Sequence, residues 1–486
     1  MKRSLSQQVG ILSLGQLLAY AVMFFVPLVN VRALSIEHYG YYRQFWLVFE
    51  TLAPLLMLGI PRSLMYFLPR AESQDEKAAY ITQTIGLLLV TSLCAVGVYA
   101  VMGSVLGHGL GALVRGFFWR LCVFTIFMVT TSYMDWLFVA ERKVGRQAVY
   151  HVLTSSSQAV VVMLTAWFKR DVSAIVWSLT IFTGVKFLFA LGYTVAVHRP
   201  ALRLISMRTL REQLSFAVPI GLSAMALVLL NQTDKFIINR FLGREAFAIY
   251  SVGAFQVPFV NMIRGSIINV IFPLMAQHHK AGNHDAILDL YRRALAKTAV
   301  LFFPVFVFLE VSARPFITIL FTDAYADATP IFMIYLLLFL RSTVETGTII
   351  QVYKKTAFLF RTVVLSFFAN LVLSILLFKM IGREGVPWAT VITMFSLSAI
   401  TLLYGAKLLG TSVKEMLPVA MLARVAVAAV LPGAGLWALY LVRAPAGILH
   451  LGAAAILYFA TYLVICLLAR LVTLDDFRSL LERRAP

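Results

Sequence analysis

Charged side chains interrupt several long apolar runs of this 486-residue chain. Lys186, Arg264 and Arg341 each lie near the middle of such a run. A charge in hydrocarbon costs at least ~2.5 kcal/mol even on a lenient insertion scale, so it normally faces water or a partner. Arg offers a planar fork for phosphate oxygens, and Lys offers a point charge. The three cations therefore predict contact with a phosphate or diphosphate headgroup whose lipid tail stays in the bilayer.

Carboxylates accompany these cations. Glu345 follows Arg341 by one helical turn, a spacing that allows a salt bridge, so the two residues could also neutralise each other as a packing device. The other acids lie nearer the ends of apolar runs: Glu50, Asp135 and Asp234. We interpret these four carboxylates as candidates to line a cavity or to couple transport to protons or sodium, and Asp234 also as a brace.

The composition indicates which elements position these residues. Hydrophobic residues make up 60% of the chain and charged residues 13%, too little charge to cover a soluble protein of this size. A membrane helix needs ~20 apolar residues, and about fourteen runs reach that length. The sequence therefore predicts an all-α, polytopic membrane protein whose first run, Val9–Val31, is a retained helix and not a cleaved signal.

The positive charges behind the net charge of +20 are unequally divided between the two predicted sides of the membrane. With the N-terminus inside, 25 of the 42 Lys and Arg residues fall on inner segments and 12 on outer ones. This asymmetry predicts that both termini are cytoplasmic. It also removes the need to invoke nucleic acid as a partner of the basic residues.

Two stretches of the chain are similar at a separation of 208 residues. The shift places Arg32 on Arg240, Glu37 on Glu245 and Tyr42 on Tyr250. Six runs in each half would give parallel repeats with one orientation. We predict a six-helix bundle over 1–205, a second over 206–410, and an additional helix pair with a cytoplasmic tail over 411–486.

Other site classes lack a signal in the sequence. The three cysteines lie within apolar runs, and His278 and His279 have no partners at metal-ligand spacing. No glycine-rich phosphate loop precedes a lysine, and no loop is long enough to form an enzyme domain. We therefore expect no catalytic residues, no metal and no cofactor.

Four segments resemble a known family. The run SFAVPIGLSAMALVLLNQTDKFIINRFLGREAFAIYSVG resembles the start of the second half of bacterial Wzx-type oligosaccharide-lipid flippases. That family shares a superfamily with peptidoglycan-precursor flippases and MATE exporters. Three further segments support the resemblance: GIPRSLMYFLPR, RPFITILFTDAYADATPIF and GREGVPWATVI.

The resemblance implies two bundles around a central cavity that opens alternately to each side of the bacterial inner membrane. It implies that undecaprenyl-diphosphate-linked oligosaccharide is moved from the cytoplasmic to the outer leaflet, beside membrane lipids and polysaccharide polymerase or glycosyltransferase partners. Lys186, Arg264 and Arg341 would match the cationic cavity residues of such flippases by type and depth.

Three alternatives stay open. A peptidoglycan lipid-precursor flippase would share the helix count and the cationic cavity. A MATE-like cation-coupled multidrug antiporter would need an acidic cavity, and the first apolar run carries no acid. A non-transporting scaffold of a polysaccharide assembly machine is the third.

Overall fold

The computed structural model describes residues 5–105, 107–199, 205–255, 258–344 and 347–471. All regular structure in these ranges is helical, which confirms the predicted all-α class. Among the described residues, eleven helical segments are long and apolar enough to cross a membrane. The segment Thr356–Leu409 contains two helices that are each long enough to cross a membrane, and a shorter apolar stretch, Leu17–Ala33, is not counted among the eleven. The count of fourteen spans therefore stays a prediction.

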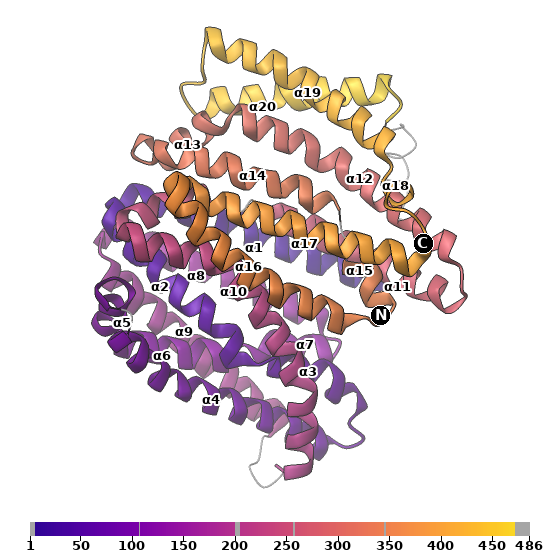
Figure 1. Cartoon of the computed structure of the whole chain (residues 1–486). Coiled ribbons are helices and arrows are strands. Elements are labelled where there is room, and N and C mark those ends of the chain that lie inside the picture. The colour runs from indigo at the N-terminus through magenta and orange to yellow at the C-terminus, as the bar shows by residue number, and fades with distance from the viewer. Residues whose placement is uncertain (1–4, 106, 200–204, 256–257, 345–346, 472–486) are drawn as a thin grey trace. The chain divides into compact units, whose positions relative to one another are not determined.

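Contacts divide the chain into two compact units, Met1–Ser251 and Val252–Pro486. The predicted boundaries at 205/206 and 410/411 describe an internal repeat and not contacts, so they too stay a prediction. The helices of the first unit can be followed in Figure 1. They are α1 (Leu5–Ala33), α2 (Ile36–Met57), α3 (Ile60–Phe67), α4 (Gln74–Val105), α5 (Ala112–Gly116), α6 (Phe118–Thr130), α7 (Tyr133–Ala140), α8 (Val144–Lys169), α9 (Val172–His198) and α10 (Met207–Gly253).

The two similar stretches of the sequence both span a break between helices. Arg32 lies in the last turn of α1 and donates to the Leu28 carbonyl oxygen at 2.8 Å. Ser35 then caps α2 by accepting a hydrogen bond from the His38 amide. In the second stretch, Gly243 interrupts α10 with φ 82° and ψ −166°. A helix break follows each of the two equivalent arginines.

One end of α10 is held in the first unit by a buried network of neutral side chains. Gln213 donates to the Ser63 and Thr84 hydroxyls, each at 2.7 Å, and accepts from the Gln83 amide at 3.0 Å. Thr209 adds a bond to the Gln83 carbonyl oxygen at 2.9 Å. Gln213 is fully buried, and an unpaired amide there would carry a large desolvation cost. These bonds fix α10 against α3 and α4.

Further along α10, paired polar groups continue to join it to α2. The Gln44 amide donates to the Asn239 carbonyl oxygen at 2.5 Å. At the far end, Arg244 pairs with Glu37 at 2.5 Å and lies 3.4 Å above the Tyr41 ring. We call this series of contacts, from the Gln213 network to Arg244, the α10 seam.

Close backbone approach between α10 and the α2–α3 junction depends on two glycines. Gly59 has φ 70°, a left-handed conformation that favours glycine. A β-carbon at Gly221 would lie 2.3 Å from the Leu58 carbonyl carbon. The α10 seam therefore joins backbones that are nearly in contact, which explains why contacts assign most of α10 to the first unit.

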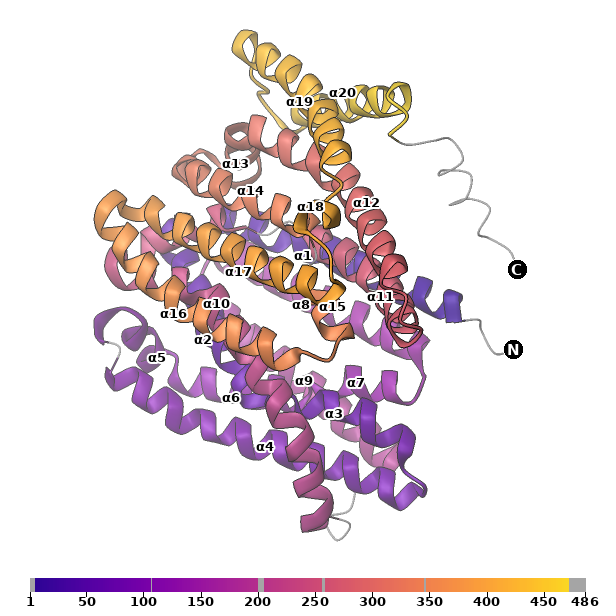
Figure 2. The same ribbon diagram turned by 45° about the vertical axis from the view of Figure 1, so that its right-hand side comes forward.

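The second unit contains the remaining helices, which Figure 2 shows from another side. They are α11 (Pro258–Lys280), α12 (His284–Val311), α13 (Ala313–Phe321), α14 (Thr329–Thr343), α15 (Gly347–Val352), α16 (Thr356–Ile381), α17 (Gly385–Leu409), α18 (Val413–Met416), α19 (Val419–Val442) and α20 (Ile448–Leu468). In both views, α16 and α17 lie side by side, with α14 next to α17.

The C-terminal helix pair packs on α12 within this unit. Tyr458 donates to the Ala429 carbonyl oxygen at 3.0 Å and joins α20 to α19. Tyr462 donates to the Val300 carbonyl oxygen at 2.9 Å and joins α20 to α12. Because each phenol finds a backbone acceptor, these two tyrosines can be buried in an apolar environment.

Candidate functional site

Lys186 lies on α9 in a group of polar side chains drawn from three helices of the first unit. Its ammonium is 5.7 Å from the centre of the Tyr150 ring on α8, a cation–π distance. Asp135, on α7, belongs to the same group through its contacts with α8. Asp135 accepts a hydrogen bond from the Gln147 amide at 3.1 Å and contacts His151 Nδ1 at 3.6 Å. We call these five residues the Asp135 cluster.

The Asp135 cluster is partly open. The side chains of Asp135 and His151 are 34% and 32% exposed, although both lie in helices that qualify as membrane spans. An ionisable pair at that depth would be expensive against lipid. This face of α7 and α8 therefore meets water or a polar ligand.

The predicted carboxylates Glu50 and Asp234 belong to the α10 seam. Gln232 donates to the exposed Glu50 carboxylate at 3.2 Å and accepts from Lys235 at 2.6 Å. Asp234 is 3% exposed and accepts a hydrogen bond from the Tyr250 hydroxyl at 3.0 Å. These bonds hold one oxygen of each carboxylate, and they favour bracing over the lining of a cavity as the role of Asp234.

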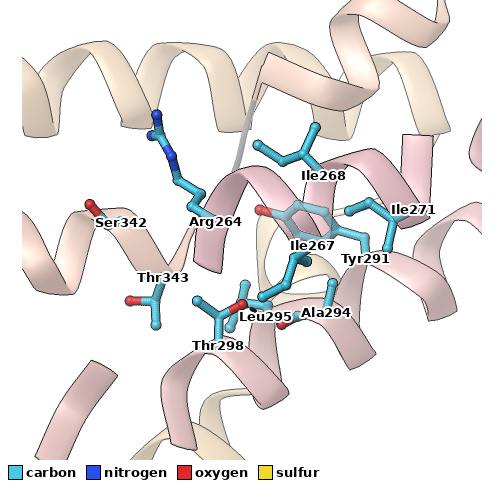
Figure 3. A pocket seen from close by; sticks show the side chains of 10 residues that line it. All are labelled: Arg264, Ile267, Ile268, Ile271, Tyr291, Ala294, Leu295, Thr298, Ser342 and Thr343. Atoms are coloured by element: carbon cyan, nitrogen blue, oxygen red, sulfur yellow. Dashed lines mark hydrogen bonds between the residues drawn. The ribbon is translucent and has the colours of Figure 1, made fainter. Parts of the chain in front are cut away.

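Arg264 lies on α11 in the second unit, where it lines a small pocket together with residues of α12 and α14. The pocket has a volume of about 20 Å³, which is room for about one water molecule. Figure 3 shows the Arg264 guanidinium extending away from the apolar side chains of this pocket, among them Ile267, Ala294 and Leu295. The charged group is therefore directed out of the pocket.

Arg341 lies in the last turn of α14, directly before the pocket residues Ser342 and Thr343. Its Nε donates to the Met394 carbonyl oxygen of α17 at 3.1 Å, so part of its hydrogen-bonding capacity serves packing. Glu345, predicted to pair with it, lies outside the described residues. The structure thus brings Arg264 and the Arg341 segment to one region of the second unit.

Six of the seven predicted residues are described, and they separate into three groups. Lys186 lies in one group with Asp135. Glu50 and Asp234 belong to the α10 seam. Arg264 is close to the Arg341 segment. Sequence reasoning missed His151, Tyr150 and Gln213. Gln213 directly follows Arg211 and Glu212 in a polar stretch of the sequence, so its type and position did not mark it as buried.

Solved structures share the fold at low sequence identity. A structure described as "Lipid II flippase MurJ, inward closed conformation" matches with TM-score 0.74 and 15% identity, over 94% of this chain and 98% of that one. An inward-facing multidrug resistance MATE family transporter of the MOP superfamily matches with TM-score 0.63 and 13% identity, over 80% and 94%. A MOP superfamily transporter from Pyrococcus furiosus matches with TM-score 0.58 and 15% identity, over 83% and 95%.

At this low identity the similarity shows the fold alone. No curated protein matches the sequence. A family model described as "Polysaccharide biosynthesis protein" matches residues 29–330, which is more than half of the chain. This multi-pass membrane protein therefore belongs to the polysaccharide biosynthesis protein family.

Proposed function

We propose that this protein is a flippase that moves undecaprenyl-diphosphate-linked oligosaccharide from the cytoplasmic to the outer leaflet of the bacterial inner membrane, by alternating access and without catalysing a chemical reaction. The observation that carries the proposal is the position of Arg264. Its guanidinium extends from α11, away from an apolar pocket wall and close to the Arg341 segment. Family membership and the shared transporter fold support the same function.

Arg264 and Arg341 bind the diphosphate in this proposal, and Lys186 supplies a further cationic contact. The pocket beside Arg264 admits about one water molecule, so the diphosphate meets the guanidinium on the side to which it points. A guanidinium can make two parallel hydrogen bonds to phosphate oxygens, which an ammonium cannot. Glu50, Asp135, Asp234 and Glu345 remain the candidate cavity or coupling carboxylates.

Substitution of Arg264 tests the proposal. Arg264→Glu should abolish glycan export in a complementation assay while folded protein stays in the membrane, because a carboxylate repels the diphosphate. Arg264→Lys should export with reduced activity, since it keeps the charge and loses the fork. Lys280→Glu makes the same reversal at the exposed end of α11 and serves as the control. Normal export by Arg264→Glu would remove Arg264 from the site.

A peptidoglycan lipid-precursor flippase is the second candidate, favoured by the extent of the MurJ match. The two functions differ in the glycan and share the diphosphate chemistry. Complementation of a strain that lacks its peptidoglycan-precursor flippase separates them, because only that function would restore growth. Failure to restore growth, together with rescue of surface glycan in a polysaccharide-export mutant, would support the first function.

The inner-membrane orientation is also part of the proposal. The excess of Lys and Arg on the predicted inner segments supports a cytoplasmic location of both termini. Reporter fusions at Ala281 and Thr329 should report the inside and the outside, respectively. Reports from the same side would contradict the predicted spans between them. Polysaccharide polymerase or glycosyltransferase partners would then approach from the membrane or from the cytoplasmic side.

A further inference from the structure

The carboxylate of Asp135 uses only one of its two oxygens within the Asp135 cluster. The Gln147 amide and His151 Nδ1 both approach the same oxygen, Oδ1, at 3.1 Å and 3.6 Å. The other oxygen, Oδ2, has no hydrogen bond or ion pair among the described residues, and it is not one of the buried unpaired atoms. The Asp135 side chain is 34% exposed. Asp135 therefore presents an accessible acceptor whose orientation is fixed through its other oxygen.

Gln147 adds a second acceptor to the cluster. Its amide nitrogen is committed to Asp135 at 3.1 Å, which leaves its carbonyl oxygen as the remaining polar atom. That oxygen is buried and has no hydrogen-bond partner among the described residues, in a side chain that is only 7% exposed. Buried polar atoms are normally paired with protein or water. The carbonyl oxygen of Gln147 is thus available to a donor that enters the cluster.

Two acceptors side by side on one chain segment favour one part of a lipid-linked oligosaccharide over the other. An ionised carboxylate and an amide oxygen can only accept hydrogen bonds. The oxygens of an ionised diphosphate also only accept, and their charge is repelled by that of Asp135. The hydroxyl groups of a sugar donate hydrogen bonds and carry no charge. The chemistry of Asp135 and Gln147 therefore fits the glycan and not the diphosphate.

The position of the cluster suits a headgroup that arrives from one side of the membrane. Gln147 and His151 lie in the first two turns of α8, roughly 5–10 Å from its start at the helical rise of 1.5 Å per residue. The turn before α8 is cytoplasmic in the predicted orientation. Tyr150 links this region to a cation, because its ring lies 5.7 Å from the Phe138 ring of α7 and 5.7 Å from the Lys186 ammonium.

We propose that Asp135 and Gln147 form a recognition site for the glycan, in which hydroxyl groups of the sugar next to the diphosphate donate to Asp135 Oδ2 and to the Gln147 carbonyl oxygen. Lys186 then contacts the diphosphate of the same molecule. Asp135 is a specificity-determining residue in this arrangement, and His151 is a positioning residue that contacts its other oxygen. This inference rests on the proposed function, and it assigns the sugar to a part of the chain distinct from Arg264 and Arg341.

The test is binding of three lipids to the purified full chain in detergent at one pH. They are undecaprenyl diphosphate, the same lipid bearing glucose, and the same lipid bearing glucose with its hydroxyl groups O-methylated, which keeps the sugar and removes its donors. Loss of a hydrogen bond to a charged group commonly weakens binding about tenfold or more. Wild type should therefore bind the glucose lipid about tenfold more tightly than the methylated lipid.

Two variants should lower this ratio of affinities. Asp135→Asn should bring it towards one, because hydrogen bonds to a neutral amide oxygen are weaker than those to a carboxylate. Gln147→Met removes the second acceptor and the amide that holds Asp135, so it should also lower the ratio. Asp75→Asn makes the same change at an exposed carboxylate in the first turn of α4 and should keep the wild-type ratio. General damage to the fold would weaken the binding of all three lipids alike and leave the ratio unchanged.

The outcomes separate the glycan site from the proposed function. Equal affinity of wild type for the glucose lipid and its methylated form would overturn the glycan site and leave the proposed function intact. An unchanged ratio in Asp135→Asn would do the same. If Asp135→Asn does not fold, Gln147→Met decides, and an unchanged ratio in that variant overturns the site. Absence of wild-type binding to all three lipids would refute the proposed function and the glycan site together.

Discussion

Two polar regions of the first unit, the Gln213 network at one end of the α10 seam and the Asp135 cluster, differ in how completely their groups are paired. In the seam, Gln213 is fully buried, and both its amide protons and its carbonyl oxygen are used by neighbouring side chains. In the cluster, Asp135 and His151 are about one-third exposed. The Tyr150 hydroxyl beside them has no partner among the described residues.

This contrast teaches that a polar residue in a membrane helix does not by itself indicate a functional site. A neutral network with every group paired can stay dry, and it specifies which helices pack together. A charged group that is partly open must meet water or a ligand. The pairing state, more than the residue type, separates a structural polar region from a candidate site.

The largest expected loss of stability comes from breaking the buried end of the seam. Gln213→Ala removes the partner of Ser63, Gln83 and Thr84, and each orphaned buried group costs about 1–3 kcal/mol. The thermal unfolding temperature in detergent should fall by several degrees. Gln74→Ala, at the exposed start of α4, is the control. Equal unfolding temperatures for these two variants would refute the structural role of the network.

A smaller loss is expected at the far end of the seam. Arg244→Ala removes the ion pair with Glu37 and the contact with the Tyr41 ring. Such exposed pairs and cation–π contacts contribute about 0.5–1 kcal/mol each. The loss should shrink in high salt, because screening weakens the ion pair. Arg240→Ala, an exposed arginine one turn earlier, provides the comparison, and a loss independent of salt would contradict the ionic contribution.

The smallest effect concerns Glu415, outside the membrane-spanning helices. The Thr411 hydroxyl and then the Ser412 amide and hydroxyl hydrogen-bond to the carboxylate and, with Arg292, lower the pKa of Glu415 below its ordinary value. Because the pKa is lower in the folded state, the ionised carboxylate stabilises the folded protein when the pH is above the ordinary pKa of glutamate. That contribution is lost as the pH falls through the folded-state pKa. Glu415→Gln should therefore be slightly less stable than wild type at pH 7.

Unfolding of both proteins is measured from pH 7 down into the acid range. The difference between Glu415→Gln and wild type should vanish at low pH, where the carboxylate is protonated. Thr411→Val removes the principal hydrogen bond and should reproduce most of the effect. A difference that persists at the lowest pH would show that Glu415 acts through packing and not through its charge.

The sequence alone was sufficient to predict the all-α membrane class and to identify which charges are energetically costly within apolar runs. Apolar runs of helical length dictate membrane helices whatever their neighbours, because backbone groups in lipid must pair within each helix. The repeated arginines Arg32 and Arg240 were also informative, since a helix break follows each of them. Lys186, Arg264 and Arg341 could be selected because their cost depends on depth alone.

The hydrogen-bond and ion-pair partners of these charged residues could not be predicted from the sequence. Asp234 is a membrane carboxylate by sequence, yet Tyr250 accounts for one of its oxygens within the seam. The Nε of Arg341 donates a hydrogen bond to the Met394 carbonyl oxygen, 53 residues away in the sequence. The contact of Asp135 with His151 requires α7 and α8 to meet. Residue type and depth determine the free-energy cost of a buried charge. Only the packing of the helices determines which group offsets that cost, because hydrogen bonds and ion pairs act over a few ångströms in space and not along the chain.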